Sequence, residues 1–244
     1  LTEALTYGSF VTVKIENMKL QHSALSEGAG EKTAAAPAEP EFAEAEKDYG
    51  FVSVCAGEGF EGLFKELGVD RIVTGGQTMN PSTDDILKEI NKTPAETVFV
   101  LPNNKNIQMA AEQTVGLTSK KVVVIPTRTV PQGVGAMLGF ADGNPFDEIV
   151  EQMKEMASNV HTAMVTYAAR DSEFDGHDIK AGEYLALLDG ALIGSFADTE
   201  TVFAEVCKAA KSLSPEYINV YYGEGVNEDM ANNDAEFIKK AFNG

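Results

Sequence analysis

Several residue types that build common functional sites are scarce in this sequence of 244 residues. It has no tryptophan, three scattered histidines (His22, His161 and His177) and two cysteines (Cys55 and Cys207) without a Cys-x-x-Cys pair. A zinc site is not expected, because zinc sites need cysteines or histidines clustered at short spacing. Both cysteines lie inside apolar runs, which is typical of buried free thiols in a reducing compartment. A cytoplasmic location is therefore expected.

Long apolar runs are also missing. No run approaches the roughly 18 residues that a membrane helix needs, so no membrane insertion is expected. The chain starts at Leu1 without a basic segment followed by an apolar one, and we see no signal peptide. Because it also lacks an initiator methionine, we expect a fragment or a processed chain.

Basic residues are few relative to acidic ones. There are 19 Lys and Arg against 38 Asp and Glu, which gives a formal net charge of −19. A surface this acidic repels phosphate backbones and anionic lipids, so nucleic acid and membrane surfaces are not expected as the main partners. The charge favours solubility and a basic protein partner.

The first 48 residues predict no compact domain. Residues 26–48 are acidic, contain almost no large apolar side chains, and are interpreted as a flexible linker. Within residues 1–25, the stretch 10–15 alternates apolar and polar side chains as a half-buried strand does. We interpret residues 1–25 as the tail of a preceding domain, with packing on the present domain as the alternative.

Residues 49–160 predict an α/β core. Short apolar strands alternate there with amphipathic helices, and this order is typical of a mostly parallel sheet with helices on both faces, a three-layer fold. The strands are expected at residues 51–55, 71–73, 97–101 and 121–125.

Residues 161–244 predict an appended, smaller α+β lobe. An antiparallel meander is expected at residues 164–167, 183–188 and 191–196, with Asp189 and Gly190 as a hairpin turn. Helices at 201–211 and 228–242 and a further strand at 217–222 are expected after it.

One glycine pattern raises a nucleotide hypothesis. Residues 57–62 read GEGFEG and match Gly-x-Gly-x-x-Gly between a strand and a helix. However, Glu58 and Glu61 would place carboxylates beside a pyrophosphate. A tight turn between strand and helix is the favoured interpretation, and nucleotide binding is the alternative.

The turn at residues 74–83 is the main candidate for a binding loop. Its glycines permit unusual backbone angles, and Ser82 can cap the next helix, yet Gln77 and Asn80 add polar groups beyond what capping needs. A well-capped loop without a ligand is the alternative. Ligands of parallel sheets bind where loops leave the carboxyl ends of strands, and three such loops share this edge. The candidate ligand- or partner-binding residues are Thr74, Gly75, Gly76, Gln77, Thr78, Asn80, Ser82, Asn103, Asn104, Lys105, Arg128, Thr129 and Gln132.

Among these residues, Lys105 and Arg128 could neutralise an acid, a phosphate or a partner's carboxylates. The sequence contains no Gly-x-x-x-x-Gly-Lys-Ser/Thr loop, no Gly-x-Ser-x-Gly elbow and no His-Glu-x-x-His motif. We therefore assign no catalytic residue and no metal ligand.

Five segments resemble the C-terminal region of the bacterial fatty acid kinase A subunit. That family is dihydroxyacetone-kinase-like and acts in phospholipid metabolism. The segments are AGEG at 56–59, GGQTMNPST at 75–83, LPNNKNI at 101–107, VIPTRTVPQG at 124–133 and VTYAARD at 165–171. The segment IENMKLQH at 15–22 also looks like the end of that family's middle domain.

The resemblance implies a DegV-like fold and a division of labour. ATP and magnesium would sit on an N-terminal domain that is not in this chain, so no cofactor is expected here. The chain would be a non-catalytic module, inactive as a kinase alone, that docks an acyl-binding, DegV-type partner protein for ATP-dependent acyl phosphorylation. The alternative is a free-standing DegV-type protein that binds fatty acids or other small molecules. A homodimer is left open.

Overall fold

The computed structural model describes residues 42–76, 80–174, 176–223 and 225–243. The chain divides into two units, Leu1–Pro40 and Glu41–Gly244, and the description below concerns the second. The strand expected at 10–15 and most of the linker expected at 26–48 lie outside the described residues. The last two residues of the expected linker, Lys47 and Asp48, form the start of strand β1.

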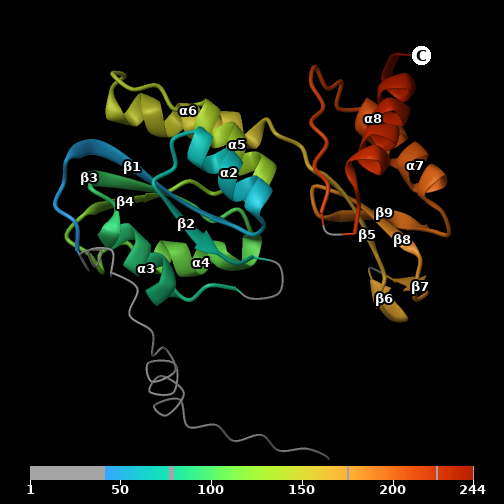
Figure 1. Ribbon diagram of the computed structural model, residues 1–244, viewed down its shortest axis with the longest axis horizontal. Helices are drawn as coiled ribbons and strands as arrows, with labels where there is room; N and C mark the ends of the chain where they lie inside the picture. The colour runs from blue at the N-terminus through green and yellow to red at the C-terminus, as the bar shows by residue number, and fades with distance from the viewer. Residues whose placement is uncertain (1–41, 77–79, 175, 224, 244) are drawn as a thin grey trace, which may run out of the picture. The chain divides into compact units, whose positions relative to one another are not determined.

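The α/β core alternates strands and helices along the chain (Figure 1). Its four strands are parallel and ordered β2-β1-β3-β4, so the longest strand, β1, lies in the interior of the sheet. The elements are β1 (Lys47–Cys55), α2 (Glu58–Glu66), β2 (Arg71–Thr74), α3 (Thr83–Lys92), β3 (Ala95–Leu101), α4 (Lys105–Gln113), β4 (Lys121–Val124), α5 (Val130–Leu138) and α6 (Phe146–Ser158).

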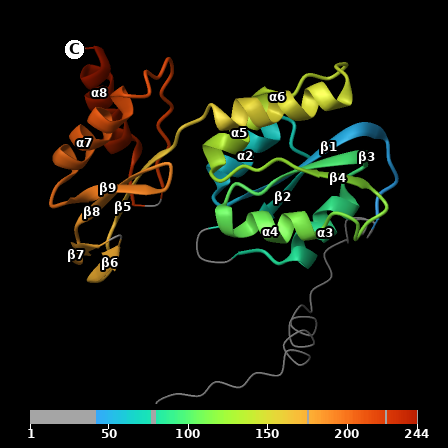
Figure 2. The ribbon, with the colours of Figure 1, turned by 180° about the vertical axis from the view of Figure 1, so that it is seen from behind.

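The sheet is covered on both faces, because successive side chains of a strand point to opposite sides. In β1, Phe51 and Cys55 pack with residues of α2, α5 and α6, whereas Val52 and Val54 pack with residues of α3 and α4. Both views show α5 and α6 on one side of the sheet and α3 and α4 on the other (Figures 1 and 2). The predicted three-layer core is confirmed.

The smaller lobe is built on an antiparallel sheet ordered β5-β8-β9. Asp189 and Gly190 form the predicted hairpin turn, both with positive φ (51° and 86°). Helix α7 covers one face of this sheet through Val202 and Val206, which pack on Ala186. The elements are β5 (Ala163–Tyr167), β6 (Ser172–Phe174), β7 (His177–Ile179), β8 (Tyr184–Leu188), β9 (Ala191–Phe196), α7 (Thr199–Lys211) and α8 (Glu228–Asn243). No helix in the described ranges is long and apolar enough to cross a membrane.

The strand predicted at residues 217–222 is wrong. The described residues between α7 and α8 contain no strand, and the side chain of Tyr217 is 88% exposed. The alternation of Tyr, Ile, Val and Tyr supplies β propensity, but a strand forms only when another strand offers its edge. The hairpin of β6 and β7 was not predicted, because strands of three mostly polar residues show no clear alternation.

The buried side chain of Lys120 binds the start of the described chain to the amino end of β3. Its ammonium group donates to the backbone oxygens of Ala43 (2.8 Å), Thr93 (2.6 Å) and Ala95 (3.3 Å), and it lies 4.8 Å from the centre of the Phe42 ring. Burial lowers the pKa of Lys120. Lys120 thus links Ala43 to Thr93 and Ala95, which lie much later in the sequence.

Replacement of Lys120 by Met should therefore destabilise the fold. We expect a loss of roughly 1–3 kcal/mol in the free energy of unfolding, because buried carbonyl oxygens lose their donor while the length of the side chain is retained. Urea unfolding followed by circular dichroism measures the change. The matched control is Lys88→Met, since the Lys88 side chain is 69% exposed and should contribute little. Equal unfolding midpoints for the two variants would contradict this role of Lys120.

Candidate functional site

The candidate site is the edge of the sheet where β1, β2, β3 and β4 end. The three predicted loops leave β2, β3 and β4 and lead into α3, α4 and α5. All four strands are parallel, so these loops share one edge, as the sequence predicted.

Asn103 is the central residue of this edge. It is 6% exposed and adopts a left-handed conformation (φ 53°), which asparagine tolerates better than most residues. Its Nδ2 donates to Ser53 Oγ and to the Val54 carbonyl oxygen, both at 2.9 Å, and its backbone N–H donates to Thr127 Oγ1 at 3.0 Å. One residue thus joins the ends of β1 and β3 to the loop after β4.

The other side of the Asn103 amide faces helix α5. Its Oδ1 is buried and has no hydrogen-bond partner among the described residues. A Cβ atom built on Gly133 would lie only 2.2 Å from this oxygen, so the amide rests against the bare backbone of Gly133. Glycine at this position lets α5 approach the loop closely.

Asn104 connects the loop after β3 with the loop after β2. Its Oδ1 caps helix α4 by accepting the backbone N–H of Asn106 at 2.8 Å. Its Nδ2 donates to the backbone oxygen of Gly76, which has a positive φ of 116°. Both polar atoms of the Asn104 amide group therefore make hydrogen bonds within the chain.

The loop after β4 is bonded in a similar way. Thr129 caps α5 by accepting the Gln132 N–H (3.3 Å), and its hydroxyl lies 2.8 Å from the hydroxyl of Thr162. The side chain of Gln132 accepts the N–H of Arg128 (2.8 Å) and donates to the Val160 carbonyl oxygen (3.3 Å). Both predicted polar residues hold the loop in place.

Ser82 starts helix α3 through a reciprocal capping box with Asp85. Hydrogen bonds from the Ser82 hydroxyl and backbone lower the pKa of Asp85. This stabilisation is present above the pKa of the unfolded carboxyl group and is lost as the pH falls through the lowered value. Substitution of Ser82 would therefore disturb the helix as well as any contact it makes.

Other predicted residues remain open to solvent. Thr74, Asn80, Lys105 and Arg128 are exposed, and within the described ranges the side chains of Lys105 and Arg128 make no ion pair. Gln77 and Thr78 lie outside the described residues. The edge thus combines an internally bonded frame with these two exposed cations, and binding by these residues stays a prediction.

The glycine-rich turn after β1 is a tight connection to α2. Gly57 has a positive φ of 94° and precedes the helix without a side-chain cap. Beside it, burial and, to a smaller extent, the Glu61 carboxylate raise the pKa of the Cys55 thiol to about 11. A thiol held neutral in this way is unsuited to act as a nucleophile.

Sequence analysis missed a partner for His161. Its Nδ1 lies 2.6 Å from Asp189 Oδ2, and Asp189 Oδ1 accepts the N–H of Thr162 at 2.9 Å. The predicted hairpin turn at Asp189 was a signal available in the sequence. The short distance between Asp189 and His161 could not be predicted from it. Within the described residues the His161 ring has no hydrogen bond to a hydroxyl group, and Asp189 links the segment at His161 and Thr162 to the hairpin turn.

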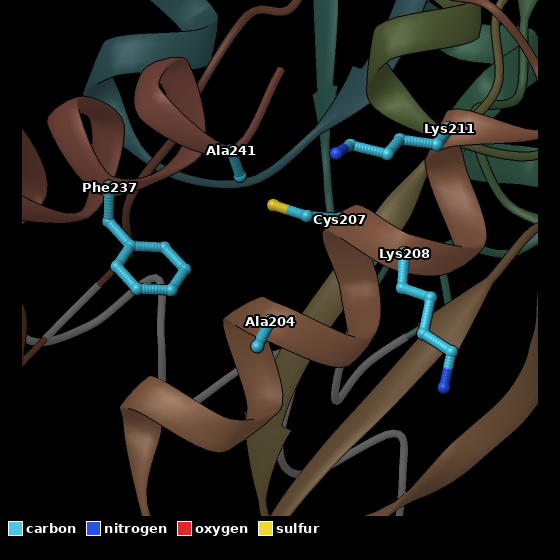
Figure 3. A pocket seen from close by; sticks show the side chains of 6 residues that line it. All are labelled: Ala204, Cys207, Lys208, Lys211, Phe237 and Ala241. Atoms are coloured by element: carbon cyan, nitrogen blue, oxygen red, sulfur yellow. The ribbon is translucent and has the colours of Figure 1, made fainter. Parts of the chain in front are cut away.

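A cavity of about 250 Å3 lies between α7 and α8 of the smaller lobe (Figure 3). Its walls are mainly apolar, and it is smaller than the roughly 300–1,000 Å3 of ordinary small-molecule sites. The lining residues are Ala204, Cys207, Lys208, Lys211, Phe237 and Ala241. Within the described ranges, no group of three or more His, Cys, Asp or Glu is placed to hold a metal ion.

Comparison with known proteins identifies relatives of the chain. Residues 50–244 match the C-terminal family of proteins like the fatty acid kinase A subunit. Protein YloV of Bacillus subtilis (strain 168) is 35% identical over 242 residues, which is 99% of this chain and 43% of that protein. An uncharacterized protein of Staphylococcus aureus (strain USA300) is 32% identical over 236 residues, or 97% of this chain and 42% of that protein. The chain thus spans less than half the length of these relatives.

The contact between Asn103 and Gly133 predicts opposite effects for two glycine substitutions. Gly133→Ala should lower the free energy of unfolding by roughly 1–3 kcal/mol, because its methyl group collides with the buried amide. Gly62→Ala, in α2 with open space around its Cβ, should raise it by roughly 0.5–1 kcal/mol. Denaturant unfolding measures both. The cost of Gly133→Ala should shrink in an Asn103→Gly background, and an unchanged cost would show that the clash lies elsewhere.

The buried thiols predict slow chemical labelling. At pH 8, a thiol with a pKa of about 11 holds on the order of 100-fold less thiolate than an ordinary cysteine, so Cys55 should react correspondingly slowly with a disulfide reagent. Mass spectrometry of peptides from a time course gives the rate for each cysteine. Labelling in urea is the control, since both thiols should then react fast. Rapid labelling of Cys55 in the native protein would refute its assignment as a buried, neutral thiol.

Proposed function

The chain belongs to the C-terminal family of fatty acid kinase A-like proteins, and from this membership we propose that it is the non-catalytic docking module of a fatty acid kinase subunit. Its role is to bind an acyl-binding partner protein so that the partner's acyl group can be phosphorylated with ATP. The observation that carries the proposal is the family match over residues 50–244, combined with a chain that spans less than half of its relatives.

Among the described residues, no group of three or more His, Cys, Asp or Glu is placed to hold magnesium. The sequence lacks a phosphate-binding loop of the Gly-x-x-x-x-Gly-Lys-Ser/Thr type, and the turn at Gly57 carries Glu58 in the position nearest a phosphate. No step of phosphoryl transfer is therefore assigned to these residues. In the proposal, ATP and magnesium belong to the part of the relatives that this chain does not span.

The carboxyl edge of the sheet supports docking better than capture of a small ligand. Several of its amide groups already donate to the backbone, as those of Asn103, Asn104 and Gln132 do. The exposed cations Lys105 and Arg128 project from this fixed frame and suit the carboxylates of a protein surface. The alternative function, binding of a fatty acid by the chain alone, would have to use the cavity of about 250 Å3 between α7 and α8 or one of about 370 Å3 between the end of α5 and α6. Both lie below or near the lower end of the range of ordinary small-molecule sites, so this function finds less support.

Calorimetry with the acyl-binding protein from the same organism tests the proposal. The chain should bind this protein, and Lys105→Glu combined with Arg128→Glu should weaken binding by about 10-fold or more. Lys88→Glu combined with Lys154→Glu is the control, because it makes the same charge change at other exposed positions. The chain alone should transfer no phosphate from ATP to the acyl group.

Absence of association with the acyl-binding protein would refute the docking role. Phosphoryl transfer by the chain alone would refute the non-catalytic assignment. Lipid found by mass spectrometry in the purified chain would favour the alternative function.

A further inference from the structure

Exposed apolar side chains gather in one stretch of the smaller lobe. The described residues include sixteen large hydrophobic side chains that are exposed, and seven of them fall between residues 217 and 230. Such a concentration is typical of an interaction surface, because single exposed apolar residues are common but contiguous ones are not. The seven are Tyr217, Ile218, Val220, Tyr221, Tyr222, Val226 and Met230, and we call these seven residues the apolar strip.

The backbone at the start of the apolar strip is also unpaired. Residues 217–223, between α7 and α8, form no helix or strand (Figure 1). No backbone N–H or C=O of residues 216–222 bonds to another residue in the described part of the chain. A segment with free backbone groups and β-prone side chains can add to the edge of a sheet in another protein. Tyrosine is moreover enriched in protein interfaces, where its ring packs and its hydroxyl bonds.

The charge around the strip selects the kind of partner. Between Lys211 and Lys239 the sequence has six acidic residues and no basic one. A second copy of the chain, with a net charge of −19, would be repelled, whereas a surface bordered by Lys and Arg would be attracted. The acidic residues are Glu216, Glu224, Glu228, Asp229, Asp234 and Glu236.

We propose that the apolar strip is a docking surface for the acyl-binding partner, at a place where that partner presents apolar side chains bordered by Lys and Arg. This inference rests on the proposed function, because that function supplies the partner. The rings of Tyr217 and Tyr222 fill the apolar centre of the contact, whereas the ring of Tyr221 packs on Phe60 of α2 within the chain. The flanking carboxylates set the orientation of the contact. Lys105 and Arg128 on the core attract acidic groups of the partner, whereas the surroundings of the apolar strip attract basic ones. The two surfaces therefore discriminate between orientations of the same partner.

Matched variants of the full chain test the strip in calorimetric titrations with the acyl-binding protein. Tyr217→Ser combined with Tyr222→Ser should raise the dissociation constant by about 30-fold or more, as loss of central aromatic residues does. The control is Tyr167→Ser combined with Met109→Ser, which removes side chains that are 68% and 70% exposed elsewhere. Glu216→Lys should weaken binding and reduce its salt dependence, whereas Glu96→Lys, at an exposed residue of β3, should not. Circular dichroism checks that each variant is folded.

The outcomes separate this inference from the proposed function. Binding by the parent chain that is lost only in the strip variants supports both. Equal binding by the strip and control variants overturns the strip and leaves the docking role intact. No binding by the parent chain overturns the docking role, and the strip with it. A dimer of the parent chain that the strip variants dissociate, seen by sedimentation, would identify a second copy as the occupant and would also overturn the inference.

Discussion

The carboxyl edge of this sheet depends on the buried side-chain amide of Asn103. Its two hydrogen bonds reach Ser53 and Val54 in β1, and its backbone N–H reaches Thr127 beyond β4. A buried donor without a partner costs about 1–3 kcal/mol, so the loops can shift only if several bonds break together. The left-handed backbone of Asn103 and the missing side chain of Gly133 are the local conditions that allow this arrangement.

This dependence changes how the polar residues of the edge are interpreted. Asn104, Thr129 and Gln132 looked like recognition residues because they follow the strand ends, yet each is bonded within the frame. Polar side chains at strand ends serve either to fix loops or to bind ligands, and composition does not distinguish these roles. The hydrogen-bond partners of each side chain do distinguish them. By this criterion Lys105 and Arg128 stay available for binding, because they are exposed and make no ion pair in the described ranges.

The difference between local sequence patterns and tertiary contacts explains which parts of the fold could be predicted from the sequence. Strands buried on both faces, such as β1 and β3, carry continuous apolar runs, and the parallel core follows from their alternation with helices. The segment 217–222 shows the opposite case, because its β propensity is local while a strand requires a partner edge. The link between His161 and Asp189 and the close approach of Asn103 to Gly133 depend on tertiary contacts, which no local pattern encodes.

In the proposed docking role, a chain with a net charge of −19 must overcome general repulsion from most other acidic proteins. Two kinds of surface meet this requirement in different ways. Exposed cations such as Lys105 and Arg128 create local attraction for carboxylates against the overall field, whereas the apolar strip uses the overall field to attract basic side chains around a hydrophobic centre. A partner that satisfies both must carry separated positive and negative regions, and few proteins would satisfy both in one orientation. In the proposed role, the acidity of the chain would therefore contribute to partner selection.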